Sequence, residues 1–285
     1  MPGKQAGWIG LGLIGLPMAA RLAAAGWQVR GFDISRLRLD LAVARGIEAA
    51  ASAEAAMEGA SLVFSSMPTD AALIELAAKL AAGLPKTAIL VETTTAGPAA
   101  SVTVAETLAA RGIRYLRSPI SGSVNLAESG GLTTFVSGPR AAFDAARPAL
   151  AAYSRAQIWL GEGEEARYAK LAVNLMVAVT AGMMKEALAL GTQGGISWEK
   201  MLELIGESVV ASPVVKYKLD PVRRHDYTPT ATTSLVLKDV DLMIGAAKLE
   251  SLELPLAAEM QKLLRRAVAE GLAERDFFSV VEGRN

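Results

Sequence analysis

The run Gly7-Trp8-Ile9-Gly10-Leu11-Gly12-Leu13-Ile14-Gly15 decides the fold of the first half of this chain. Its glycines Gly10, Gly12 and Gly15 have the G-x-G-x-x-G spacing, which lets a strand turn tightly into a helix, a pyrophosphate approach the backbone, and the helix pack closely on the strand. The pyrophosphate would lie at the helix N-terminus, where N–H groups and the helix dipole favour an anion. An acid, Asp33, follows 18 residues after the last glycine and can accept hydrogen bonds from a ribose hydroxyl. Together these features predict a dinucleotide site.

The residues around this glycine turn supply the strand–turn–helix context that the motif needs. Trp8-Ile9 is predicted to end a strand, Leu16 to Ala25 is an Ala/Leu-rich helix closed by Gly26, and Gln28 to Asp33 is predicted to form the second strand. A purely structural turn is the alternative, because glycine-rich turns are common. The context favours a functional nucleotide site.

Composition and charge narrow the class of protein. The chain has 285 residues, enough for about two domains, and its 29 Lys and Arg balance 29 Asp and Glu. Zero net charge argues against a nucleic-acid or membrane-surface partner. The lack of cysteine excludes disulfides and favours a cytoplasmic location. The uncharged run Leu171 to Met184 is too short to cross a bilayer, so it is predicted to be a buried helix.

Strand-like and helical runs alternate through the first half of the chain, which is typical of a doubly wound parallel sheet. After Gly161 the pattern changes, and apolar residues recur at helical spacing from about Glu165 to Gln193, with more helices beyond. Gly194-Gly195 ends this long helix and Ser197 can cap the next. The predicted fold class is therefore α/β, with a Rossmann-type dinucleotide-binding domain over residues 1–163 and an all-helical substrate and oligomerisation domain over residues 164–285.

The inventory of side chains limits how this chain could exchange a proton while a hydride moves to or from a carbonyl. The only histidine, His225, lies in a charged segment and is predicted to be a surface residue. One histidine and no cysteine leave the zinc site of an alcohol dehydrogenase without its ligands, and no tyrosine is followed four positions later by lysine. Lysine remains, since a dry pocket can bring a lysine pKa from about 10.4 toward 7 or 8. Lys170 has apolar neighbours, and Asn174 lies one turn along the same helix face; the alternative is a lysine that snorkels at a helix edge.

This chain is similar to the β-hydroxyacid dehydrogenase family over essentially its whole length. The similarity rests on five sequence blocks that occur in the same order, together with the lysine helix. That family includes 3-hydroxyisobutyrate dehydrogenase, tartronate semialdehyde reductase and the glyoxylate/succinic semialdehyde reductases. The matching segments are Ile9 to Ala19, Met67-Pro68, Glu92-Thr93-Thr94-Thr95, Ser118 to Ser123 with Gly130 to Thr133, Lys170 with Asn174, and Leu237 to Leu242.

The resemblance implies a role for each matching residue. It makes Lys170 and Asn174 the catalytic residues, in contact with the substrate, and Ser121-Gly122-Ser123 the loop that holds the substrate carboxylate. The implied substrate is a small β-hydroxy acid or semialdehyde acid. The implied cofactor-binding residues are Gly10, Leu11, Gly12, Leu13, Ile14, Gly15, Asp33, Met67, Pro68, Thr95 and Lys238.

Departures from the family pattern keep the substrate open. Arg117 stands where an acid is usual, Ser123 where a second glycine is common, and Gly163-Glu164-Glu165 replaces a more glycine-rich entry to the helix. In having a serine at position 123, the chain resembles the glyoxylate/succinic semialdehyde reductases. Asp33 predicts NAD rather than NADP, because a 2′-phosphate beside it would meet a like charge; use of NADP is the open alternative.

Two other functions fit the same architecture. An imine reductase shares it, but those enzymes usually replace the lysine at position 170. A catalytically inactive dinucleotide-binding protein is the non-enzyme alternative. The long apolar helix also predicts a homo-oligomer, either a homodimer or a homotetramer.

Overall fold

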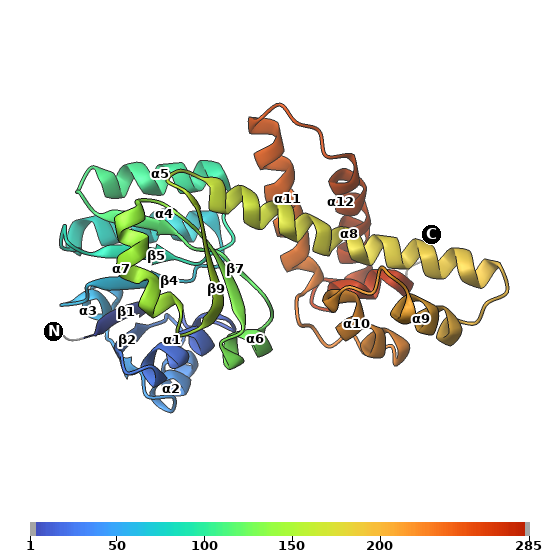
Figure 1. Ribbon diagram of the computed structural model, residues 1–285, viewed down its shortest axis with the longest axis horizontal. Helices are drawn as coiled ribbons and strands as arrows, with labels where there is room; N and C mark the ends of the chain where they lie inside the picture. The colour runs from blue at the N-terminus through green and yellow to red at the C-terminus, as the bar shows by residue number, and fades with distance from the viewer. Residues whose placement is uncertain (1–3, 283–285) are drawn as a thin grey trace. The chain divides into compact units, whose positions relative to one another are not determined.

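The computed structural model describes residues 4–282, and it divides the chain into two compact units, Met1–Lys170 and Leu171–Asn285. The first unit is an α/β domain with helices on both faces of a sheet, and the second is helical (Figure 1). This is the predicted fold class. The boundary near residue 163 stays a prediction from the sequence pattern, and the helix that follows it runs across the division between the units.

The sheet of the first unit has nine strands, and six of them follow the parallel order β3-β2-β1-β4-β5-β6. Beyond β6, β8 pairs antiparallel with β6 and β7, and β9 is parallel to β8. The strands are β1 Gln5–Ile9, β2 Gln28–Phe32, β3 Glu48–Ala49, β4 Leu62–Ser65, β5 Ile89–Glu92, β6 Arg114–Arg117, β7 Ile120–Ser121, β8 Leu132–Ser137 and β9 Ser154–Gly161.

The alternating pattern predicted a parallel sheet, and the strand pairing departs from this at the far edge. Between β7 and β8 the chain has only the six-residue helix α6, Val124–Ser129. A parallel partner needs a crossover connection of about a dozen residues or more. The chain therefore turns back and pairs antiparallel.

Helices cover both faces of the sheet because the strands are apolar on both sides. Ala6 and Trp8 of β1 belong to one core, and Ile9 belongs to the other, as expected when successive side chains alternate between the faces. The first core is closed by α1 Gly15–Ala24, α2 Arg36–Val43, α6 and α7 Arg140–Leu150. The second core is closed by α3 Ala53–Met57, α4 Asp70–Gly83 and α5 Pro98–Ala109.

The second unit is helical, and hydroxyl side chains cap the starts of several of its helices. Ser197 accepts a hydrogen bond from the Lys200 N–H, as predicted, and Ser212 and Thr232 cap two later helices in the same way. The elements are α8 Glu165–Gln193, which begins in the first unit, α9 Trp198–Glu207, α10 Pro213–Arg223, α11 Thr233–Leu249, α12 Pro255–Ala267, the π-helical turn η1 Val268–Leu272 and the 3₁₀ helix η2 Phe277–Glu282.

Helix α8 has the predicted bounds, but only one side of it is buried. Leu171, Ala178 and Met184 are buried, whereas Met176 is 73% exposed and Met183 58% exposed. Within residues 4–282, α8 is the one helix long and apolar enough to cross a membrane. The core helix of a globular enzyme meets the same criteria, and the charged side chains buried along α8 favour that interpretation.

Candidate active site

The predicted nucleotide-binding turn lies where the strand order of the sheet reverses. The glycine turn Gly10–Gly15 follows β1, and Met67-Pro68 follows the neighbouring strand β4 on the other side of the reversal. Open α/β sheets bind ligands in the crevice at the carboxyl ends of strands at such a switch point. The Met67 N–H donates to Oγ1 of Thr94, at 2.8 Å. Two predicted cofactor segments and the Thr93–Thr95 loop after β5 thus share one edge of the sheet.

The three glycines of the turn have different surroundings. Gly10 has φ +89°, and a Cβ there would overlap the Ser66 carbonyl oxygen. A Cβ on Gly15 would overlap the Gly10 carbonyl oxygen, whereas one on Gly12 would meet nothing within 4 Å. Helix α1 begins at Gly15 without a side-chain cap. The turn is thus tight at Gly10, open at Gly12 and closely packed against the helix at Gly15. A pyrophosphate-binding turn needs these three properties, so the turn fits a dinucleotide.

Asp33 is fixed at the edge of this turn by two backbone donors. Its Oδ2 accepts from the Leu11 N–H at 2.7 Å, and its Oδ1 accepts from the Ser35 N–H at 2.8 Å. A carboxylate has about four lone-pair sites, so both oxygens can still accept a hydroxyl hydrogen. The carboxylate is thus held in place before a ribose arrives.

The Ser121-Gly122-Ser123 segment is partly a strand rather than the simple turn that the sequence suggested. Ser121 lies in β7 and pairs with Thr133 of β8, and Gly122 has φ +140°. Ser123 precedes α6 but makes no side-chain cap. The two serines are half-buried and Gly122 is exposed. Serine hydroxyls are therefore partly accessible at the same edge of the sheet.

Lys170 lies in the second turn of α8, and its side chain is buried, with 9% of the residue exposed. Arg167, three residues earlier, is 1% exposed and was not identified from the sequence. Its guanidinium forms an ion pair with Glu92 and donates to the Thr94 carbonyl oxygen at 2.7 Å. This bond attaches the start of α8 to the Thr93–Thr95 loop, within the first unit.

The ionisation of this cluster follows from its burial. Burial works to lower the pKa of Arg167, but Glu92 and the Tyr115 hydroxyl outweigh it, so the pKa is raised and the guanidinium keeps its charge. Burial raises the pKa of the Tyr115 hydroxyl, which stays neutral and accepts from Arg167 at 2.7 Å. Arg167 therefore stays charged beside Glu92.

A second ion pair beside the first explains two departures from the family pattern. Arg117, where an acid is usual, pairs with Glu164, where a glycine-rich entry is usual. Both guanidinium groups donate to the Ser101 hydroxyl, at 3.2 Å from Arg167 and 3.3 Å from Arg117. The two unusual residues are thus partners, and they bind the end of β6 to the start of α8.

In the second unit, Asn174 and Lys238 meet on one carboxylate. The Asn174 Nδ2 donates to Asp239 Oδ2 at 2.9 Å. The Lys238 ammonium lies 3.1 Å from Asp239 Oδ1. The two groups form an ion pair, but this oxygen accepts no hydrogen bond within residues 4–282. Asp239 can only accept, so it orients the Asn174 amide. Asp239 lies within the matching segment Leu237 to Leu242, but no sequence pattern assigned it this role.

His225 lies at the surface, as predicted, with 61% of its side chain exposed. Its ring stacks on Trp198, with centroids 5.9 Å apart, and contacts Glu282. Residues 4–282 hold no group of three or more His, Asp or Glu side chains placed to bind a metal ion. In the described part of the chain, His225 therefore packs against Trp198 at the surface.

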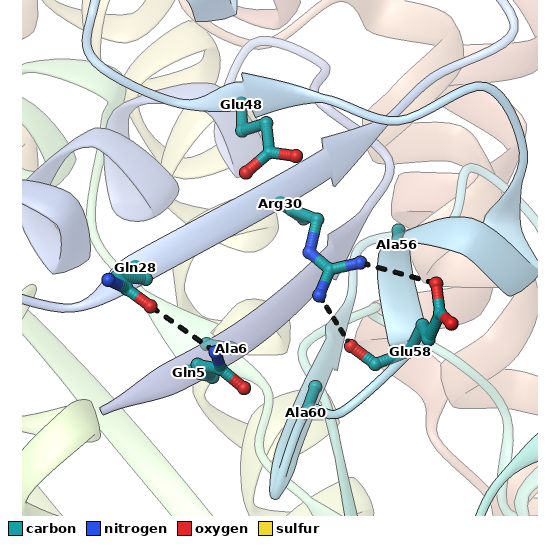
Figure 2. Close-up of a pocket in the computed structure, with 8 residues that line it drawn as sticks. All are labelled: Gln5, Ala6, Gln28, Arg30, Glu48, Ala56, Glu58 and Ala60. Carbon is teal, nitrogen blue, oxygen red and sulfur yellow. Dashed lines mark hydrogen bonds and ion pairs between the residues drawn. The ribbon is translucent and has the colours of Figure 1, made fainter. Parts of the chain in front are cut away.

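A cavity of about 120 Å³ lies at the amino ends of β1 and β2, the edge of the sheet opposite the glycine turn (Figure 2). Gln5 and Gln28 begin these strands and hydrogen bond each other at 3.3 Å. Arg30 donates to the carbonyl oxygens of Ala55 at 3.0 Å and Glu58 at 2.7 Å. Gln5, Gln28 and Arg30 are thus engaged within the protein, and the cavity lies apart from the predicted site.

Two family models match consecutive parts of the chain. Residues 5–161 match the NAD binding domain of 6-phosphogluconate dehydrogenase. Residues 164–283 match the NAD-binding domain of NADP-dependent 3-hydroxyisobutyrate dehydrogenase. Both parts of the chain are therefore related to nicotinamide-dependent dehydrogenases.

Known proteins are similar to the chain over nearly its full length. The NAD-dependent L-serine dehydrogenase of Pseudomonas aeruginosa is 31% identical, covering 98% of this chain and 97% of its own. The 2-(hydroxymethyl)glutarate dehydrogenase of Eubacterium barkeri is 27% identical, covering 97% and 93%. The solved structure of Mycobacterium tuberculosis 3-hydroxyisobutyrate dehydrogenase with L-serine has a TM-score of 0.89 at 25% identity, covering 98% of each chain.

Proposed function

Because the chain belongs to the β-hydroxyacid dehydrogenase family of NAD(P)-dependent oxidoreductases, we propose that it moves a hydride between NAD and a small β-hydroxy acid or semialdehyde acid. Lys170 is the general acid and base of this proposal. The named substrates of the similar proteins support the substrate class. L-serine, 2-(hydroxymethyl)glutarate and 3-hydroxyisobutyrate all carry a hydroxymethyl group on the carbon next to a carboxylate.

The observation that carries the proposal is the attachment of the Lys170 helix to the Thr93–Thr95 loop. Arg167 bonds the Thr94 carbonyl oxygen from one turn before Lys170. In the family pattern, Thr95 contacts the nicotinamide side of the cofactor. A buried amine held near that loop is what proton exchange beside a nicotinamide requires.

The chemistry of the chain's own residues follows from these placements. The bound nicotinamide supplies or accepts the hydride. In the oxidation direction the neutral Lys170 amine accepts the hydroxyl proton, and in the reduction direction the ammonium donates it. Asn174, oriented by Asp239, hydrogen bonds the reacting oxygen, and the Ser121–Ser123 segment binds the carboxylate through hydroxyl and N–H groups.

We infer that NAD is preferred to NADP. Asp33 cannot swing away from a 2′-phosphate without breaking its bonds to the Leu11 and Ser35 N–H groups. Two like charges about 4 Å apart repel by roughly 4 kcal/mol at an effective dielectric constant near 20, before screening. Lys238 is assigned to the cofactor side of the site, from the family pattern.

The deciding experiment measures initial rates with a panel of 3-hydroxy acids and semialdehydes, with both nucleotides. We expect turnover of at least one three- or four-carbon hydroxy acid with NAD. Activity on cyclic imines and none on hydroxy acids would establish an imine reductase instead. NADH binding without turnover of any compound would point to an inactive binding protein. Lys170 favours the dehydrogenase over both.

We also propose that the protein is a homodimer or homotetramer associated through α8. Ala172, Met176, Val179, Met183, Glu186, Leu190 and Gln193 follow the alternating spacing of four and three that forms a coiled-coil seam. Within this set, Met176, Met183 and Leu190 are 73%, 58% and 77% exposed. A second copy of the chain is the occupant that a self-complementary helix face favours. A cytoplasmic location belongs to the same proposal, supported by the lack of cysteine, and is tested by cell fractionation.

A further inference from the structure

The buried pair of Arg167 and Glu92 is connected to the Thr93–Thr95 loop, to Met67, to the segment before Ser121 and to the Lys170 turn of α8. Their side chains are 1% and 0% exposed. Around the pair, Arg167 also donates to the Ser101 hydroxyl at 3.2 Å and the Tyr115 hydroxyl at 2.7 Å. One guanidinium thus makes bonds to four different residues, counting Thr94.

The cofactor side of the site is held by the Thr94 backbone and hydroxyl. Arg167 donates to the Thr94 carbonyl oxygen at 2.7 Å, and Glu92 Oε1 accepts from the Thr94 N–H at 2.5 Å. The Thr94 hydroxyl in turn accepts from the Met67 N–H at 2.8 Å. Displacing Thr94 would therefore displace both Met67 and Thr95.

The substrate side is attached to the same pair. The Glu92 carbonyl oxygen accepts from the Ser118 N–H at 2.6 Å, three residues before Ser121. Lys170 follows Arg167 by three residues on α8, so the two side chains lie on one face of the helix. The cofactor loop, the substrate segment and the Lys170 turn are thus all connected to the buried pair of Arg167 and Glu92.

We propose that Arg167 is a positioning residue for hydride transfer, acting by fixing the Lys170 turn of α8 against the Thr93–Thr95 loop. This inference rests on the proposed function. The planar guanidinium is required because its five donors point in fixed directions, which an ammonium group cannot reproduce. A displacement of about 1 Å at a reacting group can cost about 10²-fold in rate.

The test compares Arg167→Met, Arg167→Lys and the double variant Glu92→Gln/Arg167→Met with a matched control. Arg30→Met is the control, since Arg30 also donates to two carbonyl oxygens, but at the opposite edge of the same sheet (Figure 2). We expect Arg167→Met to lower kcat about 30-fold or more, while the Kd of NADH, measured by its fluorescence, changes less than about threefold. Arg167→Lys should stay within about threefold of Arg167→Met. Arg30→Met should keep kcat within about twofold of the parent.

The double variant separates positioning from stability. Removing one partner of a buried pair leaves an uncompensated charge, and removing both relieves it. We therefore expect the double variant to melt at a higher temperature than Arg167→Met while its kcat stays low. It also carries the test if Arg167→Met does not fold. A kcat within about threefold of the parent in the double variant would show that the pair serves stability alone.

Hydrogen exchange gives a readout that does not depend on turnover. With NADH bound, amides 94–97 and 166–170 should exchange at least about tenfold faster in Arg167→Met, with those of the glycine turn unchanged. Unchanged exchange at amides 94–97 would overturn the positioning role. If the parent enzyme turned over no substrate, the proposed function would fail, and the exchange comparison would still decide whether Arg167 orders the loop.

Discussion

At the scale of single residues, the role of Lys170 is tested by removing its amine. Lys170→Ala should lower kcat by about 10²-fold or more, because a positioned acid or base typically contributes about 10² to 10⁴. NADH should still bind, since the glycine turn and Asp33 belong to other elements. In the oxidation direction the neutral amine is the base, so kcat should rise with pH, and the variant should lose this limb.

Steady-state rates across pH and NADH titration check this expectation. A snorkelling lysine would instead leave turnover near that of the parent, with a small change in stability. Retained kcat with an unchanged pH profile would remove Lys170 from the mechanism and make Lys238 the next residue to test.

The cofactor preference also belongs to one position. Asp33 is followed directly by Ile34 and Ser35. Ile34 is 96% exposed, so an arginine there has room to meet a 2′-phosphate. Asp33→Asn/Ile34→Arg should therefore raise kcat/KM with NADPH by about tenfold or more and lower it with NADH.

Asp33→Asn alone is the matched control. It removes the negative charge but adds no cation, so it should weaken discrimination without creating a preference for NADPH. A parent enzyme that already has a higher kcat/KM with NADPH would contradict the assignment of Asp33.

Single positions were accessible to sequence reasoning when their partners lay within one motif. The spacing of Gly10, Gly12 and Gly15 predicted three distinct roles, and the surroundings of the glycines match them. Arg167 was missed because its partner Glu92 lies 75 residues away, and no local spacing links the two. No local signal marked Arg167 as buried, because Glu164, Glu165 and Lys170 lie close to it in the sequence.

At the scale of elements, the turn between β1 and α1 predicts opposite effects for two glycine substitutions. Gly12→Ala adds a methyl group into open space, so the melting temperature should stay within about 2 °C while NADH binding weakens about tenfold or more. Gly15→Ala would force the methyl group against the Gly10 carbonyl oxygen, so the fold itself should lose stability. Thermal melts and NADH titrations of both variants separate these effects.

A Gly12→Ala variant that binds NADH as tightly as the parent would show that the ligand does not approach the backbone there. Gly26→Ala is no control for this pair, because Gly26 has φ +84° and strain would lower stability whatever the space.

The elements best predicted from sequence were those with a long or repeated pattern. Helix α8 was predicted with its observed bounds, because eight turns of helical periodicity outweigh local irregularity. The segment Ser121-Gly122-Ser123 was predicted to be a loop, yet Ser121 lies in β7 and α6 begins directly after Ser123. Its Gly and Ser residues signal turns, and a two-residue strand is specified only by pairing with β8, which is a tertiary interaction.

At the scale of the whole molecule, the second unit holds its C-terminal segment by a buried ion pair. Lys218 of α10 lies 2.5 Å from Asp276, and Asp276 also accepts from the Thr230 N–H at 2.9 Å and the Phe278 N–H at 3.1 Å. Neither side chain is more than 4% exposed. Helical periodicity predicted the helices here, but it could not pair residues that lie 58 positions apart.

The exposed seam of α8 leads to a prediction about assembly. Met176, Met183 and Leu190 recur every seven residues, and each is more than half exposed. Exposed apolar side chains gathered along one helix face are typical of an association surface. Light scattering at micromolar concentration should give the mass of two or four chains. Met176→Glu/Met183→Glu should shift this mass toward one chain, because two buried carboxylates in a paired seam would be unpaired charges.

Val102→Glu is the matched control, because Val102 is 42% exposed on α5 and lies outside the seam. It should leave the mass unchanged, and circular dichroism should show that all variants keep their helices. A parent mass of one chain would eliminate association through α8. An oligomer that survives both glutamates would place the interface elsewhere. If the variant becomes monomeric yet keeps its kcat, the active site is complete in one chain; if kcat falls with the mass, assembly supports catalysis.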